Sequence, residues 1–300
     1  MDWSHLKVAL AVSRGGSLTR AAQLLGMDQT TAGRRLNMLE DQLGVTLFVR
    51  AKSGFLTTEQ GQIILERALR IEAEIDRMGE DIAASHNGAV GVVRLMGNNW
   101  VLERLAGEVL PHLAQAHPKL EMVLSGRLPP APLHGEATLS FWFDAAPHAS
   151  EIALPFCRVP YAAYRARGLN VDPKDWVLFR DDDAHGPSFS RQVQKRLGPE
   201  ARVRLTATDA HILRNAARKG IGQALLPVCV GETDAALERV DEHMVPTERV
   251  LHLHVNPDTV EAKRVQIVLK AIAEDIEATL DAKLLTQPDR LLKSLKENRR

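Results

Sequence analysis

The feature that most constrains this chain is a long helical stretch that runs from residue 58 to about residue 86. It contains no proline, and one set of apolar side chains recurs at intervals of 4, 3, 4, 3 and 4 residues. That alternation is a heptad pattern, in which one stripe of a helix is buried against a second helix. At ~1.5 Å per residue the helix would be roughly 43 Å long, and Thr57 with Gln60 offers a capping box at its start. The stripe consists of Ile64, Ala68, Ile71, Ile75, Met78 and Ile82.

Such a stripe can be buried in two ways. The helix could pack against its own neighbouring domain, or it could pair with the same helix of a second copy of the chain. Residues 1–57 make a domain too small to cover the whole helix, so we favour dimerisation through residues 58–86.

The first 57 residues predict three short helices. Ser17 and Asp28 are well placed to cap the second and third helices, and Gly44 ends the third. The small side chains of Ala21 and Ala22 would let the second helix cross its neighbour closely. Two helices joined by a short turn in this way predict a helix-turn-helix.

The third helix carries hydrogen-bonding side chains on its exposed face. Glutamine pairs with adenine, arginine with guanine, and threonine offers a hydroxyl and a methyl group, so this face suits the major groove of double-stranded DNA. A merely solvated polar face is the alternative, and the helix-turn-helix context favours DNA binding. The residues are Gln29, Thr30, Thr31, Arg34 and Arg35.

A hairpin is predicted to follow the third helix. Residues 45–50 read as a strand, 51–54 as a tight turn and 55–56 as the returning strand. Arg50 and Lys52 near its tip could contact phosphates or the minor groove. Because 38 basic residues balance 38 acidic ones, any DNA binding must come from such a local surface rather than from net charge.

These residues closely resemble the N-terminal domain of LysR-type transcriptional regulators. The shared spacings are S-x-x-x-A-A from Ser17, L-E-x-x-L-G-V-x-L-F-x-R from Leu39, and G-x-L-T-x-x-x-G from residue 54. The resemblance implies a sequence-specific regulator that forms homodimers and homotetramers and responds to a small-molecule effector, with RNA polymerase as a further candidate partner. Thr30 and Gly33 depart from the family's common proline and serine, which concerns the operator sequence and not the docking mode.

From residue 91 to about 281 the pattern alternates strands with helices, which predicts an α/β domain. The predicted fold class is therefore α/β overall: a mainly α winged helix-turn-helix, a long linker helix and a C-terminal α/β domain. The resemblance implies that this domain has two lobes, like a periplasmic binding protein, with crossover strands near 155–161 and 244–252. The basic residues of 282–300 predict a solvated tail.

Small ligands of α/β sheets bind at the carboxyl ends of strands and near helix N-termini. Polar residues at such places are Asn98, Asn99, Ser125 and Thr208, and each could instead be a simple helix cap. Thr138 stands where the family often has a carboxylate, and a proline-rich loop at 127–132 replaces an expected helix. A regulator whose effector domain no longer binds ligand therefore remains a second hypothesis.

Other function classes lack support in the sequence. We find no nucleophile elbow, phosphate-binding loop or dinucleotide fingerprint, so no catalytic residue, enzyme activity or cofactor is predicted. The histidines have no metal-binding spacing, and no apolar run is long enough for a membrane helix. Cys157 and Cys229 are predicted to be buried apolar side chains rather than a redox pair, and the protein is expected to be cytoplasmic.

Overall fold

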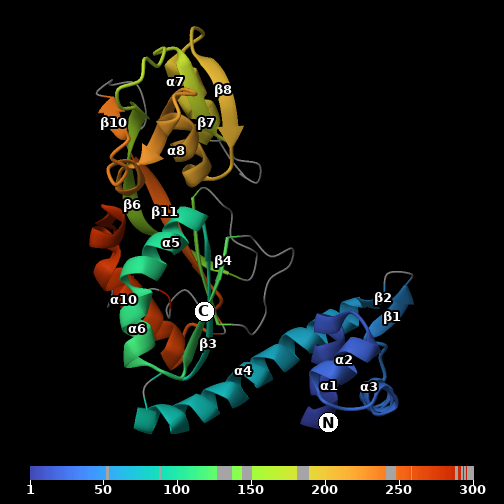
Figure 1. The fold of residues 1–300 in the computed structure, drawn as a ribbon. Coiled ribbons are helices and arrows are strands. Elements are labelled where there is room, and N and C mark those ends of the chain that lie inside the picture. Colours follow the sequence, from blue (N-terminus) through green and yellow to red (C-terminus); the bar gives the residue numbers. More distant parts are fainter. Residues whose placement is uncertain are drawn as a thin grey trace. The chain divides into compact units, whose positions relative to one another are not determined.

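The computed structural model describes residues 1–51, 54–87, 89–126, 137–143, 151–180, 189–240, 248–257, 259–287 and positions 290, 291, 293 and 295. The chain forms two compact units, Met1–Gly79 and Glu80–Arg300, which Figure 1 draws as ribbons. The first unit is mainly helical and the second combines helices with one large sheet, which confirms the predicted fold class.

Three helices open the first unit: α1 (Trp3–Gly15), α2 (Leu18–Leu24) and α3 (Gln29–Leu43). The predicted caps are confirmed, since the Ser17 hydroxyl accepts from Arg20 N and the Asp28 carboxylate accepts from Thr31 N. Gly44 takes a left-handed φ of 67° and ends α3, a conformation that glycine adopts at low cost. Ala21 and Ala22 are buried between the helices, as their small size predicted.

The hairpin is built from β1 (Phe48–Ala51) and β2 (Gly54–Thr57), which pair antiparallel. The sequence predicted that the first strand begins at Val45, whereas β1 begins at Phe48. The reason is a side chain: Glu40 Oε1 of α3 accepts hydrogen bonds from Leu47 N at 2.6 Å and Phe48 N at 3.3 Å. These two backbone N–H groups therefore bond to a side chain of α3 and not to the partner strand of a hairpin.

The long helix is α4 (Glu59–Asn87). Its cap is Thr58 and not the predicted Thr57, because Thr58 Oγ1 accepts from Gly61 N at 2.9 Å. Gly61 is needed where α4 passes the hairpin: a Cβ at this position would lie 2.2 Å from Leu47 O. The start of α4 is thus fixed against the first unit by backbone contacts.

A continuous sheet organises the second unit. Its strand order is β4-β3-β5-β11-β6-β9-β7-β8, and β10 and β12 also pair with β6. We call β6 (Ile152–Ala166) and β11 (Glu248–Val255) the crossover strands, because they pair antiparallel and join two groups of parallel strands. The resemblance placed crossovers near 155–161 and 244–252; the described parts of both ranges lie in these strands, while 244–247 lies outside the described residues.

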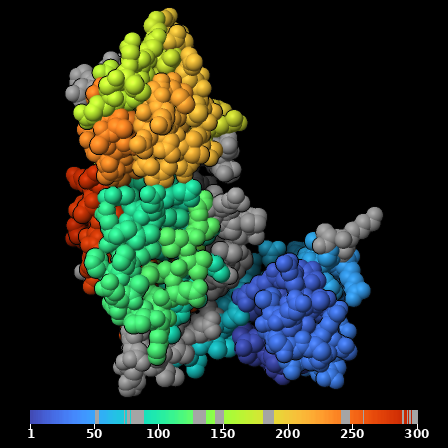
Figure 2. All heavy atoms as spheres, in the orientation of Figure 1, coloured from blue at the N-terminus to red at the C-terminus, as the bar shows by residue number. Residues whose placement is uncertain are grey.

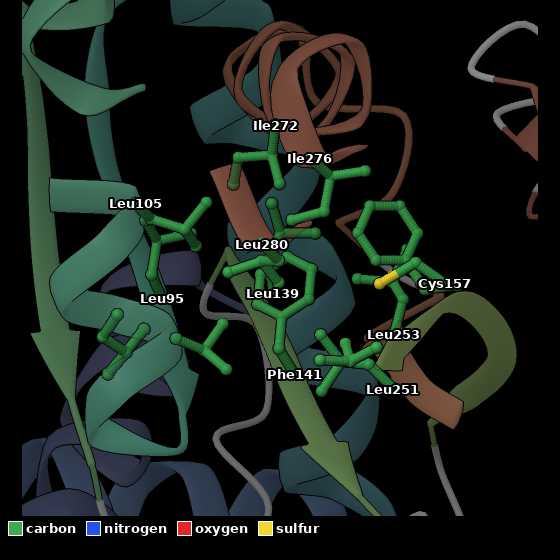
Figure 3. Close-up of a cluster of buried hydrophobic side chains, with 14 of the residues drawn as sticks. Leu95, Leu105, Leu139, Phe141, Cys157, Leu251, Leu253, Ile272, Ile276 and Leu280 are labelled. Atoms are coloured by element: carbon green, nitrogen blue, oxygen red, sulfur yellow. The ribbon is translucent and has the colours of Figure 1, made fainter. Parts of the chain in front are cut away.

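The first lobe contains β3 (Gly91–Gly97), β4 (Leu120–Ser125) and β5 (Thr138–Phe143) with helices α5 (Asn99–Glu108), α6 (Leu110–Ala116) and α10 (Lys263–Leu280). Pro111 lies in the first turn of α6 and separates this helix from α5, because proline lacks the N–H that a continuous helix would use. Figure 3 shows how α10 closes this lobe: Ile272, Ile276 and Leu280 point toward Leu139 and Phe141 of β5.

The second lobe contains β7 (Asp175–Phe179), β8 (Arg202–Ala207), β9 (Gln223–Pro227) and β10 (Leu237–Val240). Its helices are α7 (Phe189–Leu197), α8 (Ala210–Arg218) and the short α9 (Val228–Gly231). Leu213 and Ala217 of α8 pack over Val177 and Leu226 of the sheet, in a core cluster separate from that of the first lobe. Two lobes are therefore present, each with helices packed on parallel strands.

The prediction of a solvated tail at 282–300 is wrong for its described residues. The short strand β12 (Lys283–Leu284) pairs with β6, and Leu285 N donates to Phe156 O at 2.9 Å. Leu291 and Leu295 are buried in the main core of the second unit. Their spacing of four places both on one helix face, and burying that face outweighs the solvation of the basic residues around it.

Both cysteines are free and buried, as predicted. Burial raises the pKa of the Cys157 thiol and of the Cys229 thiol to about 12 in each case, so both are protonated at neutral pH. None of the helices in the described residues is long and apolar enough to cross a membrane.

Candidate nucleic-acid interface and interlobe cleft

Helix α3 presents most of the side chains that the sequence assigned to DNA reading. Gln29, Thr30 and Arg34 are exposed, while Thr31 and Arg35 are partly buried. The opposite face of α3 is anchored in the core of the first unit by Ala32, Leu36 and Leu39. The outer face is therefore held rigidly, which a base-reading surface requires.

Two hydrogen bonds between Asp28 and Thr31 fix the first turn of α3. Asp28 Oδ1 accepts from Thr31 N at 2.8 Å, and Thr31 Oγ1 donates to Asp28 Oδ2 at 2.6 Å. These hydrogen bonds lower the pKa of the Asp28 carboxyl, which stays ionised at neutral pH. The Thr31 hydroxyl hydrogen is used by the cap, so Thr31 can offer DNA its methyl group and an oxygen acceptor.

The hairpin places Arg50 in β1 with an exposed side chain. Its guanidinium lies 5.6 Å from the ring centre of Phe55 on the paired strand, which supports the side chain without neutralising it. Phe55 N donates to Gly16 O at 3.0 Å, so the hairpin is also attached to the end of α1. Lys52, the other predicted hairpin contact, lies outside the described residues.

Glu40 is a residue whose role the motif did not reveal. Its carboxylate joins α3 to the hairpin through the Leu47 and Phe48 N–H groups. The sequence signal was its fixed place before L-G-V-x-L-F, although the spacing alone does not name a partner. Glu40 therefore sets the position of the hairpin relative to the DNA-reading helix.

Replacing Glu40 by alanine is expected to lower the free energy of unfolding of the first unit by about 2 kcal/mol, because backbone N–H groups lose a charged acceptor. DNA affinity should fall with it as the hairpin shifts. Thermal unfolding of the purified variant measures the first effect. Glu40→Gln, which keeps an acceptor oxygen, is the control and should lose less; equal stability of Glu40→Ala and wild type would contradict this role.

The predicted stripe on α4 divides into two parts. Ala68 is only 1% exposed and Ile64 packs against the same core, so both contact their own domain. Further along, Ile71, Ile75 and Met78 are 45%, 41% and 61% exposed. The side chain of Ile82 lies outside the described residues.

The first part of the predicted dimerisation stripe, Ile64 and Ala68, thus packs on the domain from which the helix extends. Within the first unit Arg14 adds an ion pair with Glu72 at 2.5 Å, which fixes α4 further. The exposed stripe residues Ile71, Ile75 and Met78 lie around and beyond this ion pair.

In the second unit, the predicted ligand residues lie at the carboxyl ends of strands. Asn98 follows β3 at the cap position of α5, but its side chain makes no capping hydrogen bond, and Oδ1 is buried without a hydrogen-bond partner among the described residues. Asn99 is the next residue and lies beside Gly126, where a Cβ would be 1.8 Å from Asn99 Oδ1. Ser125 ends β4 next to this glycine, whereas Thr208 is exposed ahead of α8.

The N-termini of α5 and α8 meet across the two lobes. Asn99 Nδ2 donates to Asp209 Oδ2 at 2.9 Å, while Asp209 Oδ1 caps α8 by accepting from His211 N at 2.8 Å. One turn further, His211 Nε2 lies 2.5 Å from Glu103 Oε2 and forms an ion pair when protonated. These two contacts connect the lobes directly, and they use the polar groups that a ligand would otherwise meet.

Behind these contacts, a buried arginine is surrounded by aromatic rings. Arg249, at the start of β11, is 7% exposed. Its guanidinium carbon lies 4.0 Å from the ring centre of Phe189, 4.7 Å from Phe143, 5.7 Å from Phe179 and 5.8 Å from Tyr161. We call these four rings the aromatic box. It includes residues of the first lobe, the second lobe and a crossover strand.

The cleft around the aromatic box is almost filled by its own side chains. Trp100, which stacks on Phe143 with ring centres 6.0 Å apart, and Asn98 also line it, and the free space is about 10 Å³. This is at the lower limit for one water molecule. On the face drawn in Figure 2, the green atoms of the first lobe likewise meet the orange atoms of the second directly. The lobes are closed on one another in this structure.

Of the four predicted ligand residues, Asn98 alone is among the described residues that line the cleft, and the sequence analysis missed Arg249 and the aromatic box. A compositional signal existed: the chain has seven Phe, four Trp and two Tyr, and five of these thirteen line one small cleft. They come from elements far apart in the chain, so no local motif brings them together.

Two family models match the chain. One described as "Bacterial regulatory helix-turn-helix protein, lysR family" matches residues 3–62, and one described as "LysR substrate binding domain" matches residues 86–277. The second match alone covers more than half of the 300 residues. The first match lies within the unit Met1–Gly79 and the second within the unit Glu80–Arg300.

Relatives agree with these matches. The HTH-type transcriptional regulator BbuR of Bordetella bronchiseptica is 31% identical over 52% of this chain and 49% of its own length, so the match spans about half of that relative. The Mau operon transcriptional activator of Paracoccus denitrificans is 24% identical over 86% of this chain and 90% of its length. A full-length OxyR variant from Pseudomonas aeruginosa has the same fold, with a TM-score of 0.68 at 17% identity over 96% of this chain and 99% of that one.

Proposed function

We propose, on the premise that this chain belongs to the LysR family of bacterial regulatory proteins, that it binds a specific operator in the cytoplasm as a homodimer and responds to a small-molecule effector. The relatives are named transcriptional regulators and activators, which agrees with the prediction of a regulator and not an enzyme. Assembly into a tetramer and contact with RNA polymerase belong to the same proposal.

The observation that carries the DNA-binding proposal is the construction of α3. Its inner face is buried, its first turn is capped by Asp28, and Gln29, Thr30 and Arg34 face outward from the half that would enter a major groove. Arg34 can form two parallel hydrogen bonds with a guanine edge, while Arg50 on the hairpin is suited to phosphate. Genome-wide immunoprecipitation of the tagged protein would supply the operator for all binding tests.

Replacing Arg34 by alanine is expected to weaken operator binding and to cost about 1–3 kcal/mol of discrimination against other sequences, because a bidentate base contact is lost. Fluorescence anisotropy on operator and random duplexes, at one fixed salt concentration, measures both. Arg67→Ala removes an exposed arginine of α4 and serves as the matched control. An equal loss on both duplexes would show that Arg34 contacts only the DNA backbone.

The dimerisation proposal rests on the exposed part of the α4 stripe. Ile71, Ile75 and Met78 follow the heptad spacing and lie beyond the point where the helix leaves its own domain core. Pairing these residues with a second copy would bury them and would hold two α3 helices on one DNA molecule. The revised dimerisation set is therefore Ile71, Ile75, Met78 and, from the sequence alone, Ile82.

Effector binding is proposed at the cleft between the lobes, where the carboxyl ends of β3, β5 and β7 converge. Asn98 supports this location, because it lines the cleft and its buried Oδ1 has no hydrogen-bond partner among the described residues. Asn99 is bonded to Asp209, while Ser125 ends β4 and Thr208 follows β8 without lining the cleft. A ligand would have to part the lobes, because the free space is about 10 Å³. Such a ligand shifts the population between closed and open lobes.

The same small volume favours a second candidate function. A cleft filled by its own side chains suits a regulator whose α/β domain contributes only oligomer contacts and binds no ligand. The two candidates differ in one measurable property, since only the first predicts that a small molecule changes the thermal stability or the DNA affinity of the protein.

A further inference from the structure

We propose that the cleft selects a small aromatic carboxylate, whose ring enters the aromatic box and whose carboxylate binds the guanidinium of Arg249. This inference rests on the proposed effector function and names the ligand class. The side chains involved come from β5, β6, β7, α7 and β11 and belong to no sequence motif of the chain.

The charge of the lining is the first argument. Of the eleven described residues that line the cleft, ten are uncharged and Arg249 alone carries a charge. A cation inside an apolar cleft attracts anions more strongly than it would in water, because the surrounding dielectric is low. Arginine also presents five N–H donors in a planar arrangement, so it can donate to a carboxylate and to another partner at the same time.

The shape of the lining is the second argument. Phe189 lies 4.0 Å and Phe143 4.7 Å from the guanidinium carbon, and Trp100 stacks on Phe143. The guanidinium carbon lies over these rings, and the N–H groups of a guanidinium point outward in its own plane. A planar ligand could thus stack among the rings while its carboxylate meets the edge of Arg249.

A cationic ligand is the main competitor, because aromatic boxes also bind cations. Here, however, the box already holds a cation that is attached to the chain. An external cation would have to displace a tethered group whose effective concentration is in the millimolar range or above, whereas a carboxylate uses that group. The observations therefore favour the anion.

The test uses the full-length protein and three probes: benzoate, benzylammonium and acetate. Benzoate keeps the ring and the charge, benzylammonium reverses the charge, and acetate lacks the ring. We expect benzoate to bind with a Kd of about 1 mM, a reasonable value for nine heavy atoms, and the other two to bind at least tenfold more weakly. Titration calorimetry and the shift in thermal midpoint give both quantities. Tighter binding of benzylammonium, or no binding of benzoate up to about 10 mM, would overturn the inference.

Substitutions of Arg249 test whether benzoate binds at the proposed site. Arg249→Gln should lose benzoate binding at least tenfold, and Arg249→Lys should be intermediate because it keeps the charge but not the planar fork. Arg239→Gln, at an exposed arginine of the same domain, is the matched control and should bind like wild type. If Arg249→Gln is too unstable to purify, Phe189→Leu should weaken benzoate more than acetate, and an equal effect on both would refute stacking.

DNA binding is read separately from ligand binding. If benzoate binds through Arg249 but leaves operator affinity unchanged, the ligand class is supported and effector control fails. If the protein binds its operator and responds to benzylammonium in place of benzoate, effector control stands and the inference fails.

Discussion

Replacing both Ile71 and Ile75 of α4 by glutamate is expected to convert the protein to monomers and to weaken operator binding by about 10²–10⁴-fold. Each side chain is roughly two-fifths exposed in the single chain, so the isolated domain tolerates a carboxylate there. In a paired helix the same carboxylates would be buried next to their copies, and both desolvation and repulsion oppose association. Sedimentation velocity and anisotropy on the operator give the two readouts.

Ile63→Glu is the control for this experiment. Ile63 is 53% exposed on the same helix but lies outside the heptad stripe, so the variant should remain dimeric and bind DNA normally. A double variant that sediments as a dimer would show that the copies associate through another surface. The proposed separation of two reading helices by α4 would then have to be abandoned.

Replacing Phe141 by alanine should destabilise the second unit by about 3–5 kcal/mol and leave the first unit unchanged. Phe141 is fully buried in β5 and its ring centre lies 5.5 Å from that of Phe156 on a crossover strand. For a unit of this size the loss corresponds to a fall in Tm of about 10 °C.

Differential scanning calorimetry tests this prediction, because the two units should unfold in separate transitions. Leu47→Ala, at a fully buried position of the first unit, is the crossed control and should lower only the other transition. If Phe141→Ala shifts both transitions equally, the two units unfold cooperatively and are not independent.

Local signals in the sequence predicted the first unit well. Ser17, Asp28 and Gly44 act at their own helix ends, where a cap needs only a neighbour a few residues away. Errors arose where a distant group competed. Glu40 accepts hydrogen bonds from Leu47 N and Phe48 N, so the first hairpin strand does not extend back to Val45.

The stripe on α4 shows the limit of periodicity. A heptad pattern identifies which face of a helix is buried but not what buries it, so Ile64 and Ala68 looked identical to Ile71. The cleft shows a related limit. Asn98 and Asn99 carry a local signal as residues after a strand, whereas Arg249 acquires its surroundings only when five separate elements fold together.

The two crossover strands make the second lobe an insertion within the first. Pro160 of β6 and Glu248 of β11 are direct partners in the ladder, so the chain leaves and returns at neighbouring positions. A short turn joining these two residues would close the first lobe without the intervening segment. A recombination event at this single junction could thus exchange the whole second lobe. It would replace three of the four rings around Arg249, while the first unit with its DNA-reading helix stays the same.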